Sequence, residues 1–434
     1  MKKSIVKFAL IQLLTFIFVT TTFAEVTRQP YLQKLTSNSV LIRWQTDRFV
    51  KTVVYYGTSV DSLVFSQSNL DEKTINHLIN ITNLLSGTKY YYSVEGSAKG
   101  NPDQYFITAP NVGSKDSTRI WVISDFGQTS SKDNKRREET VKVWKSFNHN
   151  NPHADFVLSL GDQTEDDTRY QIQHNYFNQL EDVLRVSPLY TVEGNHDNHD
   201  KLENYYKTFN HPINGESGGV ASNTEDYYSF NYANIHVVVL STEIKDFGGG
   251  AQEKWLREDL ANNKQDWLIA CVHRPFHSGG HHRTNIDKIA DIERKAWLPI
   301  LEDHGVDIIL QGHNHQYERS YLLDNLTGLT TDITNKNIID NGLGREDNGG
   351  AYVKEKGKPH QGTIFIEVAA GGHASDDFEH YKIFPVYFHS KDDEGSLVID
   401  VVGNKMNVKF LCTEPDSNNG HIWDYFTIIK KNQK

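Results

Sequence analysis

Five stretches of the sequence carry side chains that can bind metal ions through oxygen or nitrogen. In chain order they are Asp125-Phe126-Gly127, Gly161-Asp162, Gly194-Asn195-His196-Asp197, His273-Arg274-Pro275 and Gly312-His313-Asn314-His315. A single aspartate after a strand is more often a turn residue or a helix cap. Five such groups in one chain, each with a carboxylate, an amide or an imidazole, instead predict one shared metal site.

The elements that must position these groups are short apolar runs, which are typical of buried strands. Each group closely follows one such run, at residues 120–124, 154–160, 189–192, 267–272 and 306–310. Stretches with helical spacing of apolar residues occupy 139–147, 171–186, 252–262 and 289–304. Strands that alternate with helices predict an α/β layered domain, in which ligand sites form at the carboxyl ends of the strands. We therefore expect the five groups to converge.

The ligand types fit a centre in which two metal ions share one carboxylate. Its predicted ligands are Asp125, Asp162, Asn195, His273, His313 and His315. Asp162 is the expected bridge, because its strand should be central in the sheet. Two ions held in this way lower the pKa of a bound water, direct it at phosphorus and neutralise the phosphoryl oxygens.

The remaining ligands divide between the two ions. Asp125 is assigned to the first ion, and Asn195 and His273 are assigned to the second. His313 and His315 are two residues apart, so in a loop they can reach different ions. One of these two histidines is therefore assigned to each ion.

The composition limits both the metal and the class of protein. A length of 434 residues indicates more than one domain. The two cysteines, Cys271 and Cys412, cannot build a thiolate metal cluster or a disulfide framework, whereas 20 histidines and 56 acidic residues suit hard or borderline metals. A formal net charge of −11 argues against a protein that follows nucleic-acid backbones or anionic membranes.

Residues 1–24 have the pattern of a cleavable secretory signal peptide, with early lysines, an apolar run from Phe8 to Val19 and a small-residue cleavage site. Cleavage removes three lysines, so the net charge of the mature chain becomes −11 − 3 = −14. We expect a secreted or periplasmic protein, and a retained N-terminal anchor is the alternative. No later segment reaches the ~18 consecutive apolar residues of a membrane span.

The chain divides into three further parts. Residues 25–112 contain short alternating strands that predict an all-β sandwich with no chemistry of its own, similar to a fibronectin type III domain. Residues 118–412 are expected to form the catalytic domain, and residues 413–434 a C-terminal tail. The insertion at 325–361, rich in Asn, Gly, Thr and Asp, is predicted as a surface loop or as a rim of the active site.

The ordered groups resemble the motifs of the calcineurin-like metallophosphoesterase superfamily. Residues 312–320 and the Asp-x-Gly that begins at Asp125 look like the purple acid phosphatase branch, whose two-domain members have an N-terminal sandwich. The resemblance implies a catalytic domain of two facing mixed β-sheets flanked by helices, after a fibronectin type III-like sandwich. It also implies two ions of iron, zinc or manganese, and a small phosphate monoester hydrolysed by in-line attack of a metal-bound hydroxide.

The resemblance further implies which residues act on the substrate. His196 resembles a substrate-facing histidine that stabilises the transition state or protonates the leaving group, with Asp197 as its orienting partner. His282 lies nine residues after the predicted ligand His273, at the spacing of a second such histidine. His281, beside it, is a candidate for substrate binding, and a solvated turn or an adventitious metal site is the alternative for this pair.

One position departs from the branch. Three residues after Asp162, the branch has a tyrosine that binds ferric iron and gives the purple colour, but this chain has Glu165. The Glu165 carboxylate either completes the shell of the first ion or is a solvated acid in an acidic loop, and a centre without the phenolate should be colourless. Arg274 and Arg319 are expected in structural ion pairs rather than in contact with phosphate.

Two other functions remain open at this point. A phosphodiesterase or nucleotidase could use the same site. A surface-associated binding protein, whose phosphatase domain has lost one metal, is an alternative of a different class, and the missing tyrosine favours it. The oligomeric state is left open.

Overall fold

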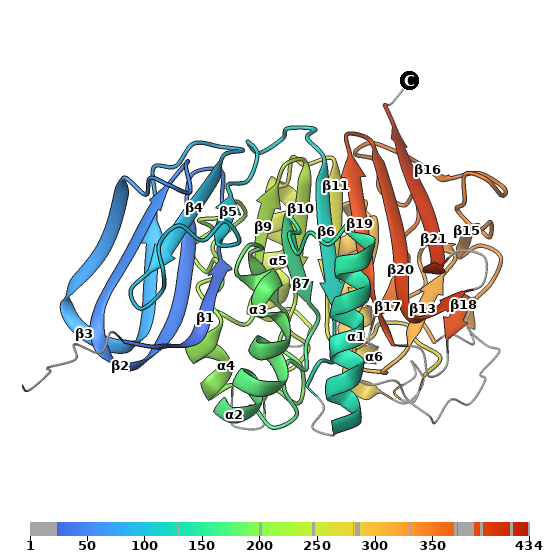
Figure 1. Ribbon diagram of the computed structural model, residues 1–434. Helices are drawn as coiled ribbons and strands as arrows, with labels where there is room; N and C mark the ends of the chain where they lie inside the picture. The colour runs from blue at the N-terminus through green and yellow to red at the C-terminus, as the bar shows by residue number, and fades with distance from the viewer. Residues whose placement is uncertain are drawn as a thin grey trace, which may run out of the picture.

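The computed structural model describes residues 24–127, 131–198, 202–244, 248–280, 282, 287–329, 332–368, 371, 386–390, 394–416 and 420–432. An N-terminal β-sheet domain lies beside a larger domain of two β-sheets and their helices (Figure 1). The predicted signal peptide falls outside the described residues, apart from its last position. Within the described residues, no helix has the length and apolarity needed to cross a bilayer.

The N-terminal domain is a five-stranded sheet built around a long hairpin. Its strands are β1 (Val26–Gln33), β2 (Val40–Gly57), β3 (Phe65–Ile81), β4 (Lys89–Val94) and β5 (Tyr105–Ile107). Strand β2 pairs with β3 over most of its length, with β1 along its first residues and with β4 along its last. Its core contains Trp44, Tyr92 and Phe106. This all-β arrangement agrees with the expected sandwich, and the likeness to fibronectin type III domains stays a prediction.

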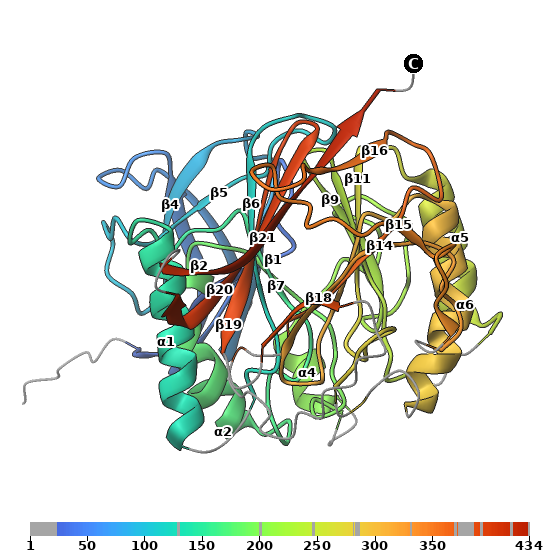
Figure 2. The ribbon, with the colours of Figure 1, turned by 90° about the vertical axis from the view of Figure 1, so that its right-hand side faces the viewer.

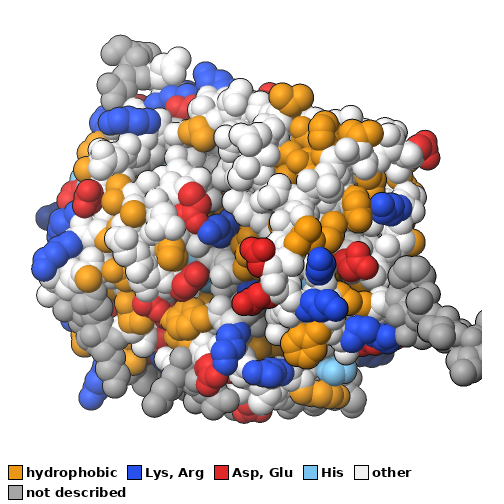
Figure 3. All heavy atoms as spheres, turned by 90° about the vertical axis from the view of Figure 1, so that its left-hand side faces the viewer, with side chains coloured by type: hydrophobic (Ala, Val, Ile, Leu, Met, Phe, Trp, Pro, Cys, Tyr) orange, Lys and Arg blue, Asp and Glu red, His pale blue; other side chains and the backbone are white. Residues whose placement is uncertain are grey.

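Polar contacts attach the N-terminal sheet to the larger domain. The Tyr31 hydroxyl and the Arg43 guanidinium both donate hydrogen bonds to the carbonyl of Thr208, at 2.9 and 2.7 Å. The Tyr92 hydroxyl donates to the carbonyl of Arg185 at 2.8 Å. On the outer face of the N-terminal sheet, charged side chains of both signs are scattered among apolar ones (Figure 3). The hydrogen bonds from Tyr31, Arg43 and Tyr92 hold the N-terminal sheet against the larger domain and involve none of the predicted metal ligands.

The larger domain contains two seven-stranded mixed sheets. The first has the order β16-β21-β20-β19-β6-β7-β8, and the second β18-β13-β17-β12-β11-β10-β9. The strands of the first sheet are β6 (Thr118–Ile123), β7 (Phe156–Ser159), β8 (Leu189–Thr191), β16 (Tyr352–Glu355), β19 (Gly395–Val402), β20 (Lys405–Asp416) and β21 (Gly420–Lys431). Those of the second are β9 (Tyr228–Tyr232), β10 (Ile235–Val239), β11 (Trp267–Cys271), β12 (Ile308–Gln311), β13 (Tyr317–Ser320), β17 (Ile364–Val368) and β18 (Val386–Ser390). Strands β6 to β8 and strands β10 to β12 run parallel within their sheets.

Helices cover the outer faces of the two facing sheets (Figure 2). They are α1 (Ser131–Phe147), α2 (Arg169–Gln171), a π-helix (Ile172–Phe177), α3 (Asn178–Leu184), α4 (Glu203–Thr208), α5 (Ala251–Asn262) and α6 (Lys288–Asp303). Alternate residues of β6 belong to different cores, because successive side chains of a strand point to opposite faces. Ile120 and Val122 join the core between the sheets, whereas Trp121 and Ile123 pack with Trp144 of α1. The predicted fold class is confirmed.

The predicted C-terminal tail is wrong, because residues 413–434 include the end of β20 and all of β21, which lies inside the first sheet. Strand β21 pairs with β20 on one side and with β16 on the other. Its Asp424 forms a fully buried ion pair with Arg319 of β13, with 2.6 Å between Nε and Oδ2. The predicted insertion 325–361 is also more than a loop, since it contains β16 and β15 (Ile338–Asp340), the latter paired with β14 (Leu322–Leu323).

A buried histidine in the N-terminal sheet predicts loss of stability in mild acid. His77 stacks on Trp44, and its ring nitrogens contact the hydroxyls of Thr46 and Thr52 at 2.9 Å each. The Thr46 hydroxyl donates to the carbonyl of Arg48, so it accepts from His77, and Thr52 donates to the other ring nitrogen. This arrangement suits a neutral imidazole. Burial lowers the pKa of His77 to about 4.

Because this pKa is lowered, His77 contributes stability above its unfolded pKa of about 6.5, and that contribution is lost as the pH falls toward 4. We expect the free energy of unfolding of wild type to fall by about 2 kcal/mol more between pH 7 and pH 5 than that of His77→Gln. Denaturant titrations of both full-length proteins at the two pH values measure this difference. Equal pH slopes would mean that the pKa of His77 is the same in the native and the unfolded state.

Candidate metal centre

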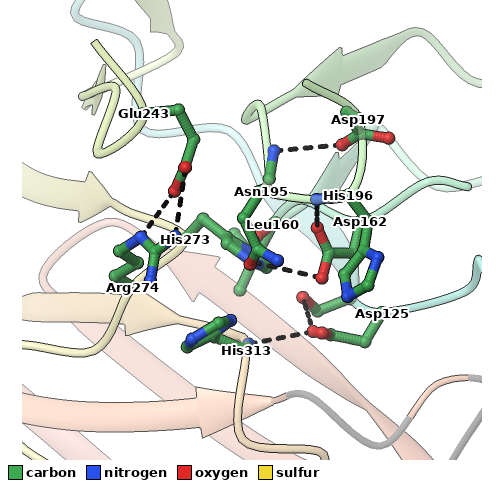
Figure 4. A network of polar contacts seen from close by, with 12 residues as sticks. Asp125, Leu160, Asp162, Asn195, His196, Asp197, Glu243, His273, Arg274 and His313 are labelled. Atoms are coloured by element: carbon green, nitrogen blue, oxygen red, sulfur yellow. Dashed lines mark hydrogen bonds and ion pairs between the residues drawn. The ribbon is translucent and has the colours of Figure 1, made fainter. Parts of the chain in front are cut away.

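The six predicted ligands follow the carboxyl ends of parallel strands from both sheets, and all but His315 are labelled in Figure 4. The first sheet supplies Asp125 after β6, Asp162 after β7 and Asn195 after β8. The second sheet supplies His273 after β11, and His313 and His315 after β12. The structure therefore brings together the side chains that the sequence predicted.

Two groups of potential ligands share the Asp162 carboxylate. One group is Asp125, Asp162 and His315, and the other is Asp162, His273 and His313. In each group the ligand atoms lie within 4.8 Å of one another. The groups have the composition expected for two ions with Asp162 between them, and one histidine of the His313–His315 pair falls in each.

The first group is held by short polar contacts. The Ser124 hydroxyl donates to Oδ2 of Asp125 at 2.5 Å, and the backbone N–H of His313 donates to the same oxygen at 3.1 Å. The other oxygen of Asp125 lies 3.3 Å from Nε2 of His315. The Asp125 carboxylate is thus oriented by one oxygen and presents the other toward His315 and the shared carboxylate.

The second group is oriented by the backbone. Nδ1 of His273 donates a hydrogen bond to the carbonyl of Leu160 at 2.8 Å, which directs Nε2 into the site. There Nε2 lies 3.0 Å from Oδ1 of Asn195 and 3.3 Å from Oδ2 of Asp162. A carbonyl partner of this kind selects the tautomer and the ring orientation that a metal-binding histidine needs.

The electrostatic potential at the centre is strongly negative. Burial alone would lower the pKa of His273, but the charge of Asp162 and its contact with the ring raise it to about 10. Burial acts against ionisation of Asp162, yet His273 and the backbone N–H of His196 lower its pKa to about 2. The field that holds a proton on a buried imidazole also favours a bound cation.

Two buried ligand atoms are placed so that a metal ion could be their partner. Among the described residues, Nε2 of His313 is buried and has no hydrogen-bond partner, and the buried Oδ1 of Asp125 has none beyond its 3.3 Å contact with Nε2 of His315. Buried polar atoms normally have partners. Both atoms point into the ligand groups described above, so the side chains present fit metal ions of the oxygen- and nitrogen-binding type.

The backbone is strained where four of the ligands lie. Asp125, Asp162, His313 and His315 have φ values of 53, 50, 81 and 51°. Positive φ is uncommon for residues other than glycine, and such conformations cluster at functional sites. The strand ends are therefore shaped to direct side chains inward rather than to make relaxed turns.

The structure differs from the sequence interpretation at Asp197, which does not orient the His196 ring. Its carboxylate instead accepts hydrogen bonds from the backbone N–H groups of Gln163, Thr164 and Gly194, at 3.0 to 3.3 Å. Asp197 thereby ties the loop of Asp162 to the loop of Asn195. A carboxylate next to a histidine looks like a catalytic pair in sequence, because backbone donors on other loops are not visible there.

Glu165 lies beside His196 rather than in either ligand group. The backbone carbonyl of Glu165 accepts a hydrogen bond from Nδ1 of His196 at 3.0 Å, and its carboxylate oxygen lies 3.6 Å from the same nitrogen. The His196 backbone N–H donates to Oδ1 of Asp162 at 2.9 Å. His196 therefore sits against the shared carboxylate, with Glu165 on its outer side.

His282 also lies at the centre, next to His313. The two imidazole ring centroids are 4.0 Å apart, and the His282 backbone N–H donates to Oδ1 of Asn314 at 2.6 Å. His281, the candidate for substrate binding, lies outside the described residues. Asp287 was missed by sequence reasoning, although it groups with His282 and His313, because an Asp before an apolar helix is ordinarily an N-cap.

Asp287 also caps α6 and pairs with Arg274. Its Oδ1 accepts from the backbone N–H groups of Ile289 and Ala290, and its Oδ2 lies 3.1 Å from the guanidinium of Arg274. Arg274 pairs in addition with Glu243 at 2.8 Å. Together with the buried Arg319–Asp424 pair, this confirms the expectation that both arginines belong to structural ion pairs.

Comparisons with known proteins agree with this geometry. Residues 118–317 match the Calcineurin-like phosphoesterase family. Purple acid phosphatase 15 of Arabidopsis thaliana is 29% identical over 348 residues, which cover 65% of this chain and 62% of that protein. Acid phosphatase type 7 of Danio rerio is 25% identical over 319 residues, covering 65% of this chain and 68% of that protein. The chain thus spans less than two thirds of the Arabidopsis relative.

Two solved structures share the fold. Purple acid phosphatase PPD1 from yellow lupin seeds superposes with a TM-score of 0.71 at 15% identity, over 94% of this chain and 75% of that one. PhoD superposes with a TM-score of 0.65 at 13% identity, over 95% of this chain and 91% of that one. Residues 118–317 thus resemble a calcineurin-like phosphoesterase domain in sequence, and the chain shares the fold of the lupin phosphatase. Over about 65% of its length, the chain is similar in sequence to a purple acid phosphatase and to an acid phosphatase.

Proposed function

We propose that the chain hydrolyses phosphate monoesters at a centre of two metal ions. The observation that carries this proposal is the Asp162 carboxylate, which is common to two ligand groups of carboxylate and imidazole side chains. Asp125, Asp162 and His315 would hold the first ion, and Asp162, Asn195, His273 and His313 the second. The names of the relatives, which describe acid phosphatases, support the same reaction.

When bound, two ions supply a water of lowered pKa as the nucleophile and positive charge for the phosphoryl oxygens. The protein's part is to orient the ligands, which it does through the Leu160 carbonyl on His273 and the Ser124 hydroxyl on Asp125. The ligand loops also exclude bulk solvent, because Asp125 and His273 are at most 1% exposed. Positioning of this kind is the main contribution that a protein makes to phosphoryl transfer.

His282 and His196 are proposed to act on the leaving group and on the phosphoryl oxygens. The His282 main chain is held by Asn314, and its ring lies against that of His313 at the second ligand group. The His196 ring is fixed through Nδ1 by the Glu165 carbonyl, beside the shared carboxylate. An imidazole so placed can donate a proton to a departing alkoxide or a hydrogen bond to a phosphoryl oxygen.

The proposal also includes export of the protein from the cytoplasm and the type of metal that it binds. The N-terminal pattern supports a secreted or periplasmic protein with a mature net charge of −14. A phosphate ester is repelled by that charge at a distance, so its attraction must come from the ions and histidines of the centre. Iron, zinc or manganese suits the mixed oxygen and nitrogen ligands, and Glu165 in the tyrosine position supports a colourless centre.

The test is metal content measured together with hydrolysis. The purified full-length chain should bind two ions per chain at its centre when reloaded with zinc, manganese or iron, and should hydrolyse an aryl phosphate monoester without an intense visible absorption band. Faster hydrolysis of an aryl phosphodiester would move the proposal to the diesterase alternative. Absence of hydrolysis with all three metals would exclude the enzyme and leave the binding protein.

A further inference from the structure

A second cluster of metal-binding side chains lies far from the centre, where three segments of the larger domain meet. Glu302 is in the last turn of α6, Asp324 follows β14, and His360 lies in the loop between β16 and β17. One ligand atom from each lies within 4.8 Å of the other two. Asp287 and Glu302 lie fifteen positions apart along α6, and the helical rise of about 1.5 Å per residue separates them by about 22 Å.

Glu302 supplies an independent sign that a ligand is missing. The residue is 2% exposed, and its Oε1 accepts a hydrogen bond from the backbone N–H of Asn325 at 3.1 Å. Its Oε2 is buried and has no hydrogen-bond partner among the described residues. A buried carboxylate oxygen without a partner is costly, and here it belongs to a side chain whose ligand atom faces Asp324 and His360.

The surroundings favour a positive charge. The cluster lies at the C-terminal end of α6, where the helix dipole is negative. Asp303 and Asp324 add two carboxylates, which contact His360 at 3.0 and 3.1 Å through Nε2 and Nδ1. Burial, followed by the charge of Asp324, raises the pKa of Glu302.

We propose that Glu302, Asp324 and His360 form a third metal site, which binds one zinc-like divalent cation. Two carboxylates and one imidazole suit Zn²⁺ or Mn²⁺, with water in the remaining positions, whereas Ca²⁺ takes oxygen ligands. Bonds of about 2.1 Å in a tetrahedral site place ligand atoms about 3.4 Å apart, so the three side chains close slightly around the ion. Binding of the ion would replace the direct contact between Nδ1 of His360 and the Asp324 carboxylate.

The site would fasten the insertion to the domain. Asp324 immediately precedes the insertion, which begins at Asn325 and whose first turn is held by Asn337, and His360 lies at its far end with a φ of 54°. The backbone N–H of His360 also donates to the carbonyl of Glu302 at 3.2 Å. One cation at this point connects both ends of the insertion to α6, a structural role that leaves the phosphoesterase centre unchanged.

The experiment counts zinc bound by the metal-stripped full-length chain in equilibrium dialysis. Glu302→Gln and His360→Asn should each bind one ion per chain fewer than wild type, and the zinc-induced rise in Tm should be smaller in both. The glutamine keeps an acceptor for the Asn325 N–H, so that Glu302→Gln tests the charge rather than the fold. His304→Gln, on the same end of α6, is the matched control and should bind as many ions as wild type.

The comparison between variants is independent of the phosphoesterase proposal, because it measures the difference in bound ions and not the total. Activity of Glu302→Gln on an aryl phosphate should equal that of wild type. The third site is overturned if wild type and both variants bind the same number of zinc ions. In that case the imidazolium of His360, paired with Asp303 and Asp324, is the only cation of the cluster.

Discussion

Asp162→Asn should lose at least about 10³-fold in kcat/KM on an aryl phosphate and should bind fewer ions at the centre than wild type. Metal ions stabilise transition-state charge by several kcal/mol, and each 1.4 kcal/mol is about tenfold in rate. Asp162 is the residue common to both ligand groups, so its replacement weakens both at once. Steady-state kinetics and metal analysis on the same samples measure the two effects together.

The control for this variant is Asp182→Asn. Asp182 lies in α3 and pairs with Lys145 and Arg185 on the surface, away from the ligand loops. It should keep wild-type activity and metal content, because exposed ion pairs contribute little. If Asp162→Asn retained both ions and full activity while folding normally, the shared carboxylate would not be the bridge, and the two-ion proposal would lose its main support.

Gly194→Ala should reduce kcat/KM by about 100-fold or more, although the change adds a single methyl group. A Cβ atom at Gly194 would overlap the Asp162 carboxylate and its backbone nitrogen. The loops of Asp162 and Asn195 would have to separate, and a displacement of about 1 Å at a catalytic site can cost about 100-fold in rate. Kinetics with excess metal distinguish misplacement from simple loss of the ions.

Gly342→Ala is the matched control for the glycine change. A Cβ there meets only the Asp340 side chain, at 3.0 Å from a carboxylate oxygen, in the exposed part of the insertion. Its activity should be close to that of wild type. Wild-type kinetics for Gly194→Ala would show that the approach of the two loops is not needed for the reaction.

The ligand set could be predicted from sequence because its geometry is local to each strand. Asp125, Asp162 and His273 each stand at the end of an apolar strand, and parallel strands bring such ends to one edge. The different placement of His313 and His315 also followed from their spacing within one loop. These predictions needed only the strand pattern and the chemistry of the side chains.

Features that depend on distant partners could not be predicted. The buried ion pair between Asp424 of β21 and Arg319 of β13 joins residues that are far apart in the sequence, so the place of this segment in the sheet could not be predicted. Asp197 has an ordinary position after His196, and its role depends on N–H groups of the Asp162 loop. The π-helix Ile172–Phe177 shares apolar spacing with an α-helix, so periodicity alone predicted one continuous helix there.

The division of the ligands between two sheets has a consequence for the order of events during synthesis. Strand β6, which precedes Asp125, pairs with β19, and β12, which precedes His313, pairs with β17. Neither strand has both neighbours until nearly the whole chain has left the ribosome. If the centre holds two ions as proposed, their loading follows synthesis of nearly the whole polypeptide, and the ions available are those of the compartment in which its last strands fold.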